Sequence, residues 1–214
     1  MASSASISII AVACVTCILF YGIYLDIEVV VFVAASKSSP LDPEMKALLE
    51  TGWWSSADTN NSSSPSECYD ISCTAGGRVT KINLAKSYLE GEIPLSIINL
   101  TQLLTFDIAS NNIHGSIPLE MGNMESWNHL YLSLNKISGS IPTGIGNLKN
   151  LMRLHLKSNN LIGPVPTTLD GCSYVQELIL SHNYLIGRFS HRFADLYWLN
   201  TNLSHNFFGG EIPV

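Results

Sequence analysis

Apolar side chains recur with a regular period from Val79 to the end of the chain. Each period carries apolar residues at its first, fourth, sixth and eleventh positions, as in LMRLHLKSNNLIGPVP, which begins at Leu151. One copy alone cannot bury these side chains, whereas stacked copies bury them in a continuous core. The pattern therefore predicts a solenoid. Its turns are expected at residues 79–102, 103–126, 127–150, 151–174 and 175–197, with a partial turn at 198–214.

The first half of each period predicts a short strand. Side chains alternate along a strand, so the fourth and sixth positions face the core and the polar residues beside them face outward. An asparagine follows in most copies, where the chain must turn inward. Its buried amide offers two donors and an acceptor to the turn backbone of neighbouring copies. These ladder asparagines are Asn111, Asn135, Asn159, Asn183 and Asn206.

Glycine and proline punctuate the second half of each period. The glycine marks a tight bend that a side chain would obstruct. The proline that follows is expected at a strand edge, where no backbone donor is needed. Cys172 stands where another copy has Leu148, so we expect a buried apolar residue and not a nucleophile. The prolines at this position are Pro94, Pro118, Pro142, Pro166 and Pro213.

The segments GEIP, GSIP and GPVP of the repeat, together with the flank EMKALLETGWW…CYDISC…GRVTKINL, carry a family resemblance. Over residues 41–214 the chain resembles the extracellular region of plant leucine-rich-repeat receptor-like kinases. The resemblance implies an α/β leucine-rich-repeat solenoid. Such a solenoid is a right-handed superhelix of plant-type 24-residue repeats, with a parallel β-sheet on its concave side.

The same resemblance assigns residues 36–78 to an N-terminal cap. The segment PEMKALLETGWW supplies its helix, with Pro43 near the start, and a disulfide between Cys68 and Cys73 closes it. Related caps place six residues between these cysteines, whereas this chain places four. Kinase activity is not carried over, because the chain has neither a glycine-rich phosphate loop with its catalytic set nor a second apolar span.

Residues 1–35 are expected to direct the chain into the secretory pathway. Residues 7–25 carry no charge, and the small residues Val33 and Ala35 suit cleavage after Ala35. The stretch is also long enough to span a bilayer, so an uncleaved signal anchor and a buried helix remain alternatives. An oxidising compartment would itself favour pairing of Cys68 with Cys73. Glycosylation sequons, which suit export, occur at Asn60, Asn61, Asn99 and Asn202.

The charge balance and the motifs argue against two broad classes of protein. The formal net charge of −6 disfavours a nucleic-acid binder, which needs a basic face. The chain has no G-x-S-x-G nucleophile turn and no H-E-x-x-H helix. We therefore expect no enzyme, no cofactor and no metal site.

The outward residues beside the strands form the predicted concave face, where such solenoids bind their ligands. Five basic residues on it, among them Lys86 and Lys136, face two acids, which favours an acidic ligand such as a carboxylate-bearing peptide or an acidic oligosaccharide. Solvated surface charge is the alternative. Four of the six histidines also lie here, so we expect binding to depend on pH. The candidate binding residues are Lys81, Asp107, His129, Tyr131, Arg153, His155, Lys157, Glu177, Ile179 and His182.

These features together predict a recognition module, secreted or tethered to the membrane. Its expected partners are a peptide or protein ligand and a co-receptor ectodomain. A secreted inhibitor or decoy and a truncated receptor fragment are the alternatives. The final stretch NFFGGEIPV stops within a repeat, and we expect its strand edge to fray or to self-associate.

Overall fold

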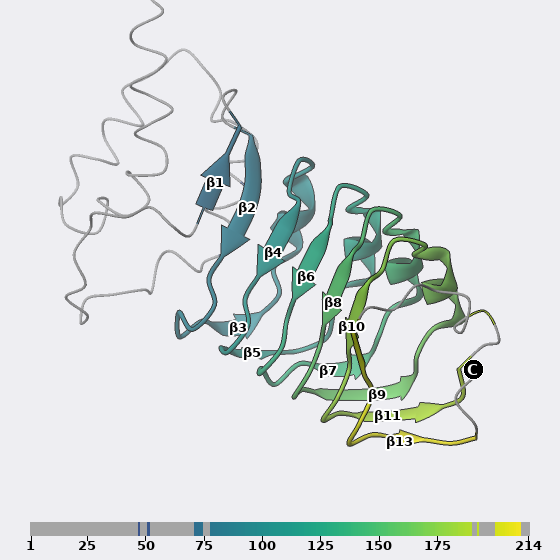
Figure 1. Cartoon of the computed structure of the whole chain (residues 1–214). Coiled ribbons are helices and arrows are strands. Elements are labelled where there is room, and N and C mark those ends of the chain that lie inside the picture. Colours follow the sequence, from purple (N-terminus) through teal and green to yellow (C-terminus); the bar gives the residue numbers. More distant parts are fainter. Residues whose placement is uncertain are drawn as a thin grey trace, which may run out of the picture.

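A computed structural model describes residues 47, 51, 71–74, 78–189, 192 and 200–210 of the chain. Successive turns of the chain stack along one axis (Figure 1). Most turns contribute a strand to a sheet on one side, a second short strand below it, and a 3₁₀ helix on the opposite side. The predicted solenoid with parallel repeat strands is confirmed.

The larger sheet contains seven strands in the order β1-β2-β4-β6-β8-β10-β12. Its first two strands, β1 (Ile71–Cys73) and β2 (Val79–Asn83), pair antiparallel, and all later neighbours pair in parallel. The strands β4, β6, β8 and β10 bury their middle residue and leave both flanking residues half-exposed. We call this the concave sheet. Its later strands are β4 (Thr105–Asp107), β6 (His129–Tyr131), β8 (Arg153–His155), β10 (Glu177–Ile179) and β12 (Asn200–Asn202).

Two smaller parallel sheets follow the inward turn of each repeat. One has the order β13-β11-β9-β7, and the other pairs β3 with β5. Along the other side of the solenoid, the 3₁₀ helices of adjacent turns pack against one another. These strands are β3 (Glu90–Glu92), β5 (Asn112–His114), β7 (Ser138–Ser140), β9 (Asn160–Pro164), β11 (Tyr184–Gly187) and β13 (Phe207–Phe208). The 3₁₀ helices are η1 (Leu95–Asn99), η2 (Leu119–Asn123), η3 (Thr143–Asn147) and η4 (Thr167–Gly171).

The repeated prolines lie at the start of the 3₁₀ helices, so their predicted place at a strand edge is wrong. Pro94, Pro118, Pro142 and Pro166 each directly precede one helix, with φ between −74° and −60°. The ring holds φ near this value and removes a backbone donor that the first turn of a helix does not use. Each proline carbonyl accepts the first helical hydrogen bond, as in Ile97 N–H to Pro94 O at 3.2 Å.

The 3₁₀ helices approach so closely that glycine is required between them. A methyl group at Gly122 would lie 2.5 Å from the carbonyl oxygen of Gly144. At Gly146 it would overlap the backbone carbonyl of Thr168. Because backbone atoms cannot move aside as a flexible side chain can, these contacts set the stacking distance on this side of the solenoid.

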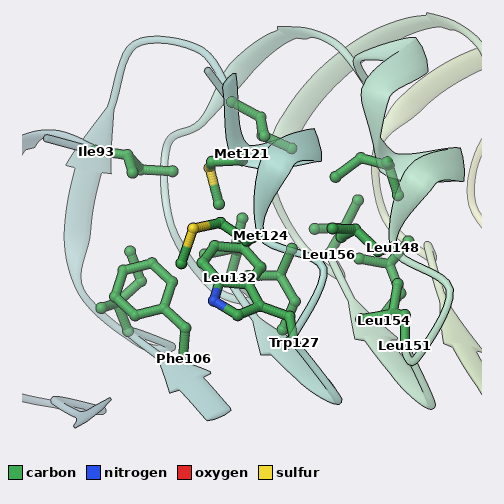
Figure 2. Close-up of a cluster of buried hydrophobic side chains, with 14 of the residues drawn as sticks. Ile93, Phe106, Met121, Met124, Trp127, Leu132, Leu148, Leu151, Leu154 and Leu156 are labelled. Atoms are coloured by element: carbon green, nitrogen blue, oxygen red, sulfur yellow. The ribbon is translucent and has the colours of Figure 1, made fainter. Parts of the chain in front are cut away.

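The core is a continuous row of side chains between the concave sheet and the 3₁₀ helices. Phe106 and Trp127 are fully buried, and their rings stack with centroids 5.6 Å apart. Figure 2 shows Met121 and Met124 beside these two rings. The Nε1 of Trp127 is buried with no hydrogen-bond partner among the described residues. Cys172 is fully buried, as predicted, and its thiol donates to the carbonyl oxygen of Ile145 at 3.2 Å.

The side chains of the ladder asparagines join neighbouring turns. In the fourth turn, Asn159 is 5% exposed. Its Oδ1 accepts from the backbone N–H of Ile137 at 3.0 Å, and its Nδ2 donates to the carbonyls of Leu132 and Leu156 at 2.9 and 3.1 Å. Asn111, Asn135, Asn183 and Asn206 make equivalent bonds. Each turn is thus tied to the next by buried amides at equivalent positions.

Several expectations concern parts of the chain that lie outside the described residues. These are the segment 1–35, most of the cap helix, Cys68, the sequons at Asn60 and Asn61, and the final residues 211–214. None of the helices in the described part has the length and apolarity that a bilayer span requires.

Candidate functional site

The concave sheet presents two outward-facing residues on each strand from β2 to β12. They form two parallel rows that cross the repeats, because equivalent residues of neighbouring strands are directly paired. One row contains Lys81, Thr105, His129, Arg153, Glu177 and Asn200. The other contains Asn83, Asp107, Tyr131, His155, Ile179 and Asn202. These rows bring eight of the ten candidate binding residues onto one surface, which we call the concave face.

An aromatic cluster occupies the centre of the concave face. The ring of Tyr131 lies between two imidazoles. It stacks with His129 at a centroid distance of 6.0 Å and meets His155 edge-on at 4.8 Å. The guanidinium of Arg153 reaches the Tyr131 hydroxyl at 3.5 Å. All four side chains are partly exposed, so the cluster is both ordered by mutual contacts and open to a ligand.

Glu177 ties the cluster to the next strand. Its two carboxylate oxygens accept from Arg153 Nε at 3.1 Å and from His155 Nε2 at 2.9 Å. The hydrogen bond to Tyr131 and the Glu177 carboxylate raise the pKa of Arg153. Arg153 therefore stays charged at every physiological pH. Its N–H groups that bind neither Glu177 nor Tyr131 can donate to a ligand.

Burial shifts the pKa values of Asp107 and His129 on the concave face in opposite directions. Burial raises the pKa of Asp107, although the backbone N–H of Ala109, which donates to its Oδ1 at 2.9 Å, and the charge of Lys81 oppose the rise. Burial and the charge of Arg153 lower the pKa of His129. His129 Nδ1 lies 3.2 Å from the Thr105 hydroxyl, so the neutral imidazole is held by its neighbour strand.

Two of the candidate residues, Lys157 and His182, lie beyond the strands. Lys157 follows β8. His182 occupies the turn after β10, where its ring stacks on that of His205. The equivalent position in other repeats also has a left-handed backbone, as at Lys86, Leu134 and His205. Leu134, which is 52% exposed, is a residue of this edge that the sequence analysis missed; its repeat position, shared with Lys86 and His182, was the available signal.

Lys136 does not belong to the concave face, and its assignment there is wrong. It follows the ladder residue Asn135, after the chain has turned, and its backbone N–H donates to the carbonyl of Ile113 in β5 at 2.8 Å. It therefore lies on the side of the smaller sheets. The basic residues of the concave face and its edge are Lys81, Lys86, Arg153 and Lys157.

The chemistry of the face suits binding more than catalysis. No group of three or more His, Cys, Asp or Glu side chains in the described part of the chain could enclose a metal ion. Burial raises the pKa of the Cys172 thiol to about 11, which keeps it protonated and unreactive. The concave face itself offers charged, aromatic and amide groups at fixed spacing.

Two of the four sequons lie within the described part, on opposite sides of the solenoid. Asn99 ends η1 on the 3₁₀ side and is exposed. Asn202 lies on β12 of the concave sheet, is exposed, and accepts from the backbone N–H and the hydroxyl of Ser204 at 3.2 and 2.8 Å. A glycan on Asn99 would leave the concave face open, whereas one on Asn202 would cover its last strand.

Comparison with known protein families places the repeat in a broad class. The Leucine Rich Repeat family model matches residues 126–148. No curated protein sequence matches the chain significantly.

Solved structures of plant ectodomains share the fold. The ectodomain of the Arabidopsis thaliana receptor kinase GASSHO1/SCHENGEN3, in complex with CASPARIAN STRIP INTEGRITY FACTOR 2, is 34% identical with a TM-score of 0.60; the match covers 62% of this chain and 16% of that one. The plant peptide hormone receptor RGFR1, in complex with RGF2, is 31% identical with a TM-score of 0.59, over 61% and 21% of the two chains. The present chain thus spans only a small part of both receptors.

A third structure matches over nearly its full length. It is the BIR3–SERK2 complex from Arabidopsis thaliana, 30% identical with a TM-score of 0.65, and the match covers 78% of this chain and 94% of that one. The likeness therefore extends over a complete chain of similar size as well as over segments of larger receptors.

Proposed function

Because this chain belongs to the leucine-rich-repeat family, we propose that it is an extracellular recognition module that binds a peptide or a partner ectodomain through its concave face. The similar receptors GASSHO1/SCHENGEN3 and RGFR1 were solved in complex with CASPARIAN STRIP INTEGRITY FACTOR 2 and RGF2, and BIR3 with SERK2. A peptide or protein partner is therefore the class of ligand that the likeness supports.

The observation that carries this proposal is the ordered cluster of Tyr131, Arg153, His155 and Glu177. Aromatic and arginine side chains supply most of the binding energy at protein interfaces. Here mutual hydrogen bonds and ring contacts already hold them in place, so a ligand does not have to order them on binding. Their position on β6, β8 and β10 also leaves room along the face on both sides for an extended ligand.

We further propose that the ligand carries acidic groups. The chain as a whole has a charge of −6. By contrast, Lys81, Lys86, Arg153 and Lys157 on the concave face and its edge outnumber Asp107 and Glu177, and Glu177 already engages Arg153. A face that is more positive than the rest of the molecule attracts anionic groups and raises their association rate.

Titration of the purified chain with acidic and neutral peptides of equal length, at two salt concentrations, tests both parts of the proposal. We expect tighter binding of the acidic peptide, weakened by salt. Arg153→Ala and Lys157→Ala should weaken it, whereas Lys136→Ala, which removes the same charge from the other side of the solenoid, should not. Equal and salt-independent binding of both peptides would overturn the acidic preference. Binding that the Arg153 and Lys157 variants leave unchanged would overturn the concave site.

We propose that the chain enters the secretory pathway and carries a glycan on Asn99, the exposed sequon on the 3₁₀ side. Expression in plant cells, followed by glycosidase treatment and mass spectrometry, should show a loss of mass that Asn99→Gln abolishes. Expression without any glycosidase-sensitive mass, together with retention in the cytosol, would contradict this placement.

A further inference from the structure

Two histidines from successive turns lie face to face at the edge of the concave sheet. The ring centroids of His182 and His205 are 4.0 Å apart and the ring planes differ by 15°. Both residues are exposed. They follow β10 and β12, so the stacking of the solenoid brings together side chains that lie 23 positions apart in the sequence.

The backbone holds this pair in place. Both residues have left-handed backbones, with φ of 58° and 55°, so their side chains leave the chain in the same direction. His182 N–H donates to Ser204 O at 3.0 Å, and the next N–H, of Asn183, donates to His205 O at 3.1 Å. The ladder amides of Asn183 and Asn206 fix the same turns from inside. Hydrogen bonds between turns thus fix the spacing of the two backbone positions from which the rings project.

The hydrogen bonds around His205 determine which of its nitrogens carries a lone pair. The Ser204 hydroxyl donates its one hydrogen to Asn202 Oδ1 at 2.8 Å. Its oxygen lies 3.1 Å from His205 Nδ1, so Nδ1–H must be the donor in that contact. Nε2 of the neutral ring is therefore unprotonated and free to bind a cation. Metal-binding histidines are commonly oriented in this way, with the second ring nitrogen donating to a neighbour.

We propose that His182 and His205 form a two-histidine binding site for a divalent transition-metal cation, with Cu²⁺ preferred over Ni²⁺ and Zn²⁺. Imidazole nitrogens suit these cations, and a pair without any carboxylate discriminates against Mg²⁺ and Ca²⁺, which require oxygen ligands. Two nitrogens bound at right angles to one metal at a distance of about 2.0 Å lie about 2.8 Å apart. The stacked rings differ by only 15° in plane, so their in-plane lone pairs run nearly parallel, and both exposed side chains must rotate about their torsions before they bind one ion.

The site goes beyond the proposed peptide-binding function and does not depend on it. Two protein ligands leave coordination positions open on the metal. A histidine or carboxylate of a molecule bound along the concave face could fill them, since β10 and β12 belong to that face. The positive charge of nearby Lys157 repels cations from His182. The metal ion must therefore be held by coordinate bonds to the ring nitrogens, because the local charge does not attract it.

Calorimetric titration of the purified, metal-free and tag-free chain with Cu²⁺ at neutral pH in a non-coordinating buffer tests the proposal. We expect one Cu²⁺ per chain, and electron paramagnetic resonance should show two nitrogen ligands. His182→Ala and His205→Ala should each lower the affinity at least about tenfold, and Ser204→Ala should lower it less. The control is His114→Ala, which removes an exposed histidine from β5 and should leave the affinity unchanged.

The double variant His182→Ala/His205→Ala separates a shared site from two independent ones. If both rings bind one ion, each single variant already loses the shared site, so the second substitution lowers the Cu²⁺ affinity much less than the first. If the rings bind ions independently, the two substitutions have separate effects that add. Unchanged affinity in either single variant, loss of affinity in His114→Ala, or equal competition by Mg²⁺ would overturn the proposal. Circular dichroism of each variant should match the parent chain, because the substituted side chains are exposed.

Discussion

The ladder of buried asparagines makes a quantitative prediction at Asn159. The substitution Asn159→Ala removes one acceptor and two donors from the interior of the solenoid. The N–H of Ile137, whose hydrogen bond to Asn159 Oδ1 measures 3.0 Å, is left without that partner. An orphaned buried N–H costs about 1–3 kcal/mol of stability.

The two carbonyl groups that accept from Asn159 Nδ2 lose less in this substitution than the N–H of Ile137 does. Leu132 O also accepts from Asn135, and Leu156 O also accepts from Asn183. Because each carbonyl keeps one donor, losing the other costs only about 0.5–1.5 kcal/mol per bond. We therefore expect Asn159→Ala to lower the free energy of unfolding by about 2–6 kcal/mol.

The adjacent residue supplies a matched control. Asn160 is exposed, and the described part of the chain offers its side chain no hydrogen bond. Asn160→Ala should change the free energy of unfolding by less than about 0.5 kcal/mol. Equilibrium urea denaturation, followed by circular dichroism, measures both variants. Hydrogen exchange should in addition show faster exchange of the Ile137 amide in Asn159→Ala.

Two outcomes would contradict this prediction. In one, Asn159→Ala is as stable as Asn160→Ala; in the other, Asn159→Ala is destabilised while the amide of Ile137 keeps its protection. The first result would mean that the ladder contributes nothing net. The second would mean that the loss arises elsewhere, for instance from a cavity.

Three further predictions concern close packing and buried groups. Gly146→Ala should destabilise the chain by about 1–3 kcal/mol, because its methyl group overlaps the Thr168 carbonyl, whereas Gly209→Ala meets nothing within 4 Å and should be neutral in the same denaturation assay. Burial raises the pKa of Cys172 to about 11, so its thiol should resist iodoacetamide at pH 8 in the native state and react in urea. Mass spectrometry of the Cys172 peptide measures the labelling, and fast labelling of the native chain would contradict the prediction. The Ser181 hydroxyl is buried with no partner among the described residues, so Ser181→Ala should stabilise the chain by about 1 kcal/mol, and a loss of stability would reveal an unrecognised bond.

Much of the fold follows from the order of residues within a single repeat. The middle residues Phe106, Leu130 and Leu154 are buried because alternation along a three-residue strand leaves them only the core side. The prolines were misplaced because a missing N–H suits both a strand edge and a helix start. The 3₁₀ helix after Pro142 instead depends on packing against the helices of adjacent turns, a contact that one repeat does not contain.

The candidate site was predictable as a surface but not as an arrangement. The repeat register alone puts Tyr131, Arg153 and Glu177 on the outward side of neighbouring strands. It does not say that Glu177 binds both Arg153 and His155, or that Tyr131 lies between two imidazoles. Those contacts depend on side-chain torsions and on the strand spacing. Lys136 was wrongly placed on this face because the sequence does not mark how abruptly the chain turns after Asn135.

By itself, the sequence determined that this chain forms a solenoid, because the periodic apolar side chains are buried only when successive copies stack. Only the tertiary structure decided which side chains of different turns meet. His182 and His205 become neighbours, and Ser204 directs the ring of His205, through hydrogen bonds between turns. The physical reason is the distance along the chain over which each feature is decided. Alternation within a few residues decides which side chains are buried, whereas contacts between turns depend on how closely whole turns stack.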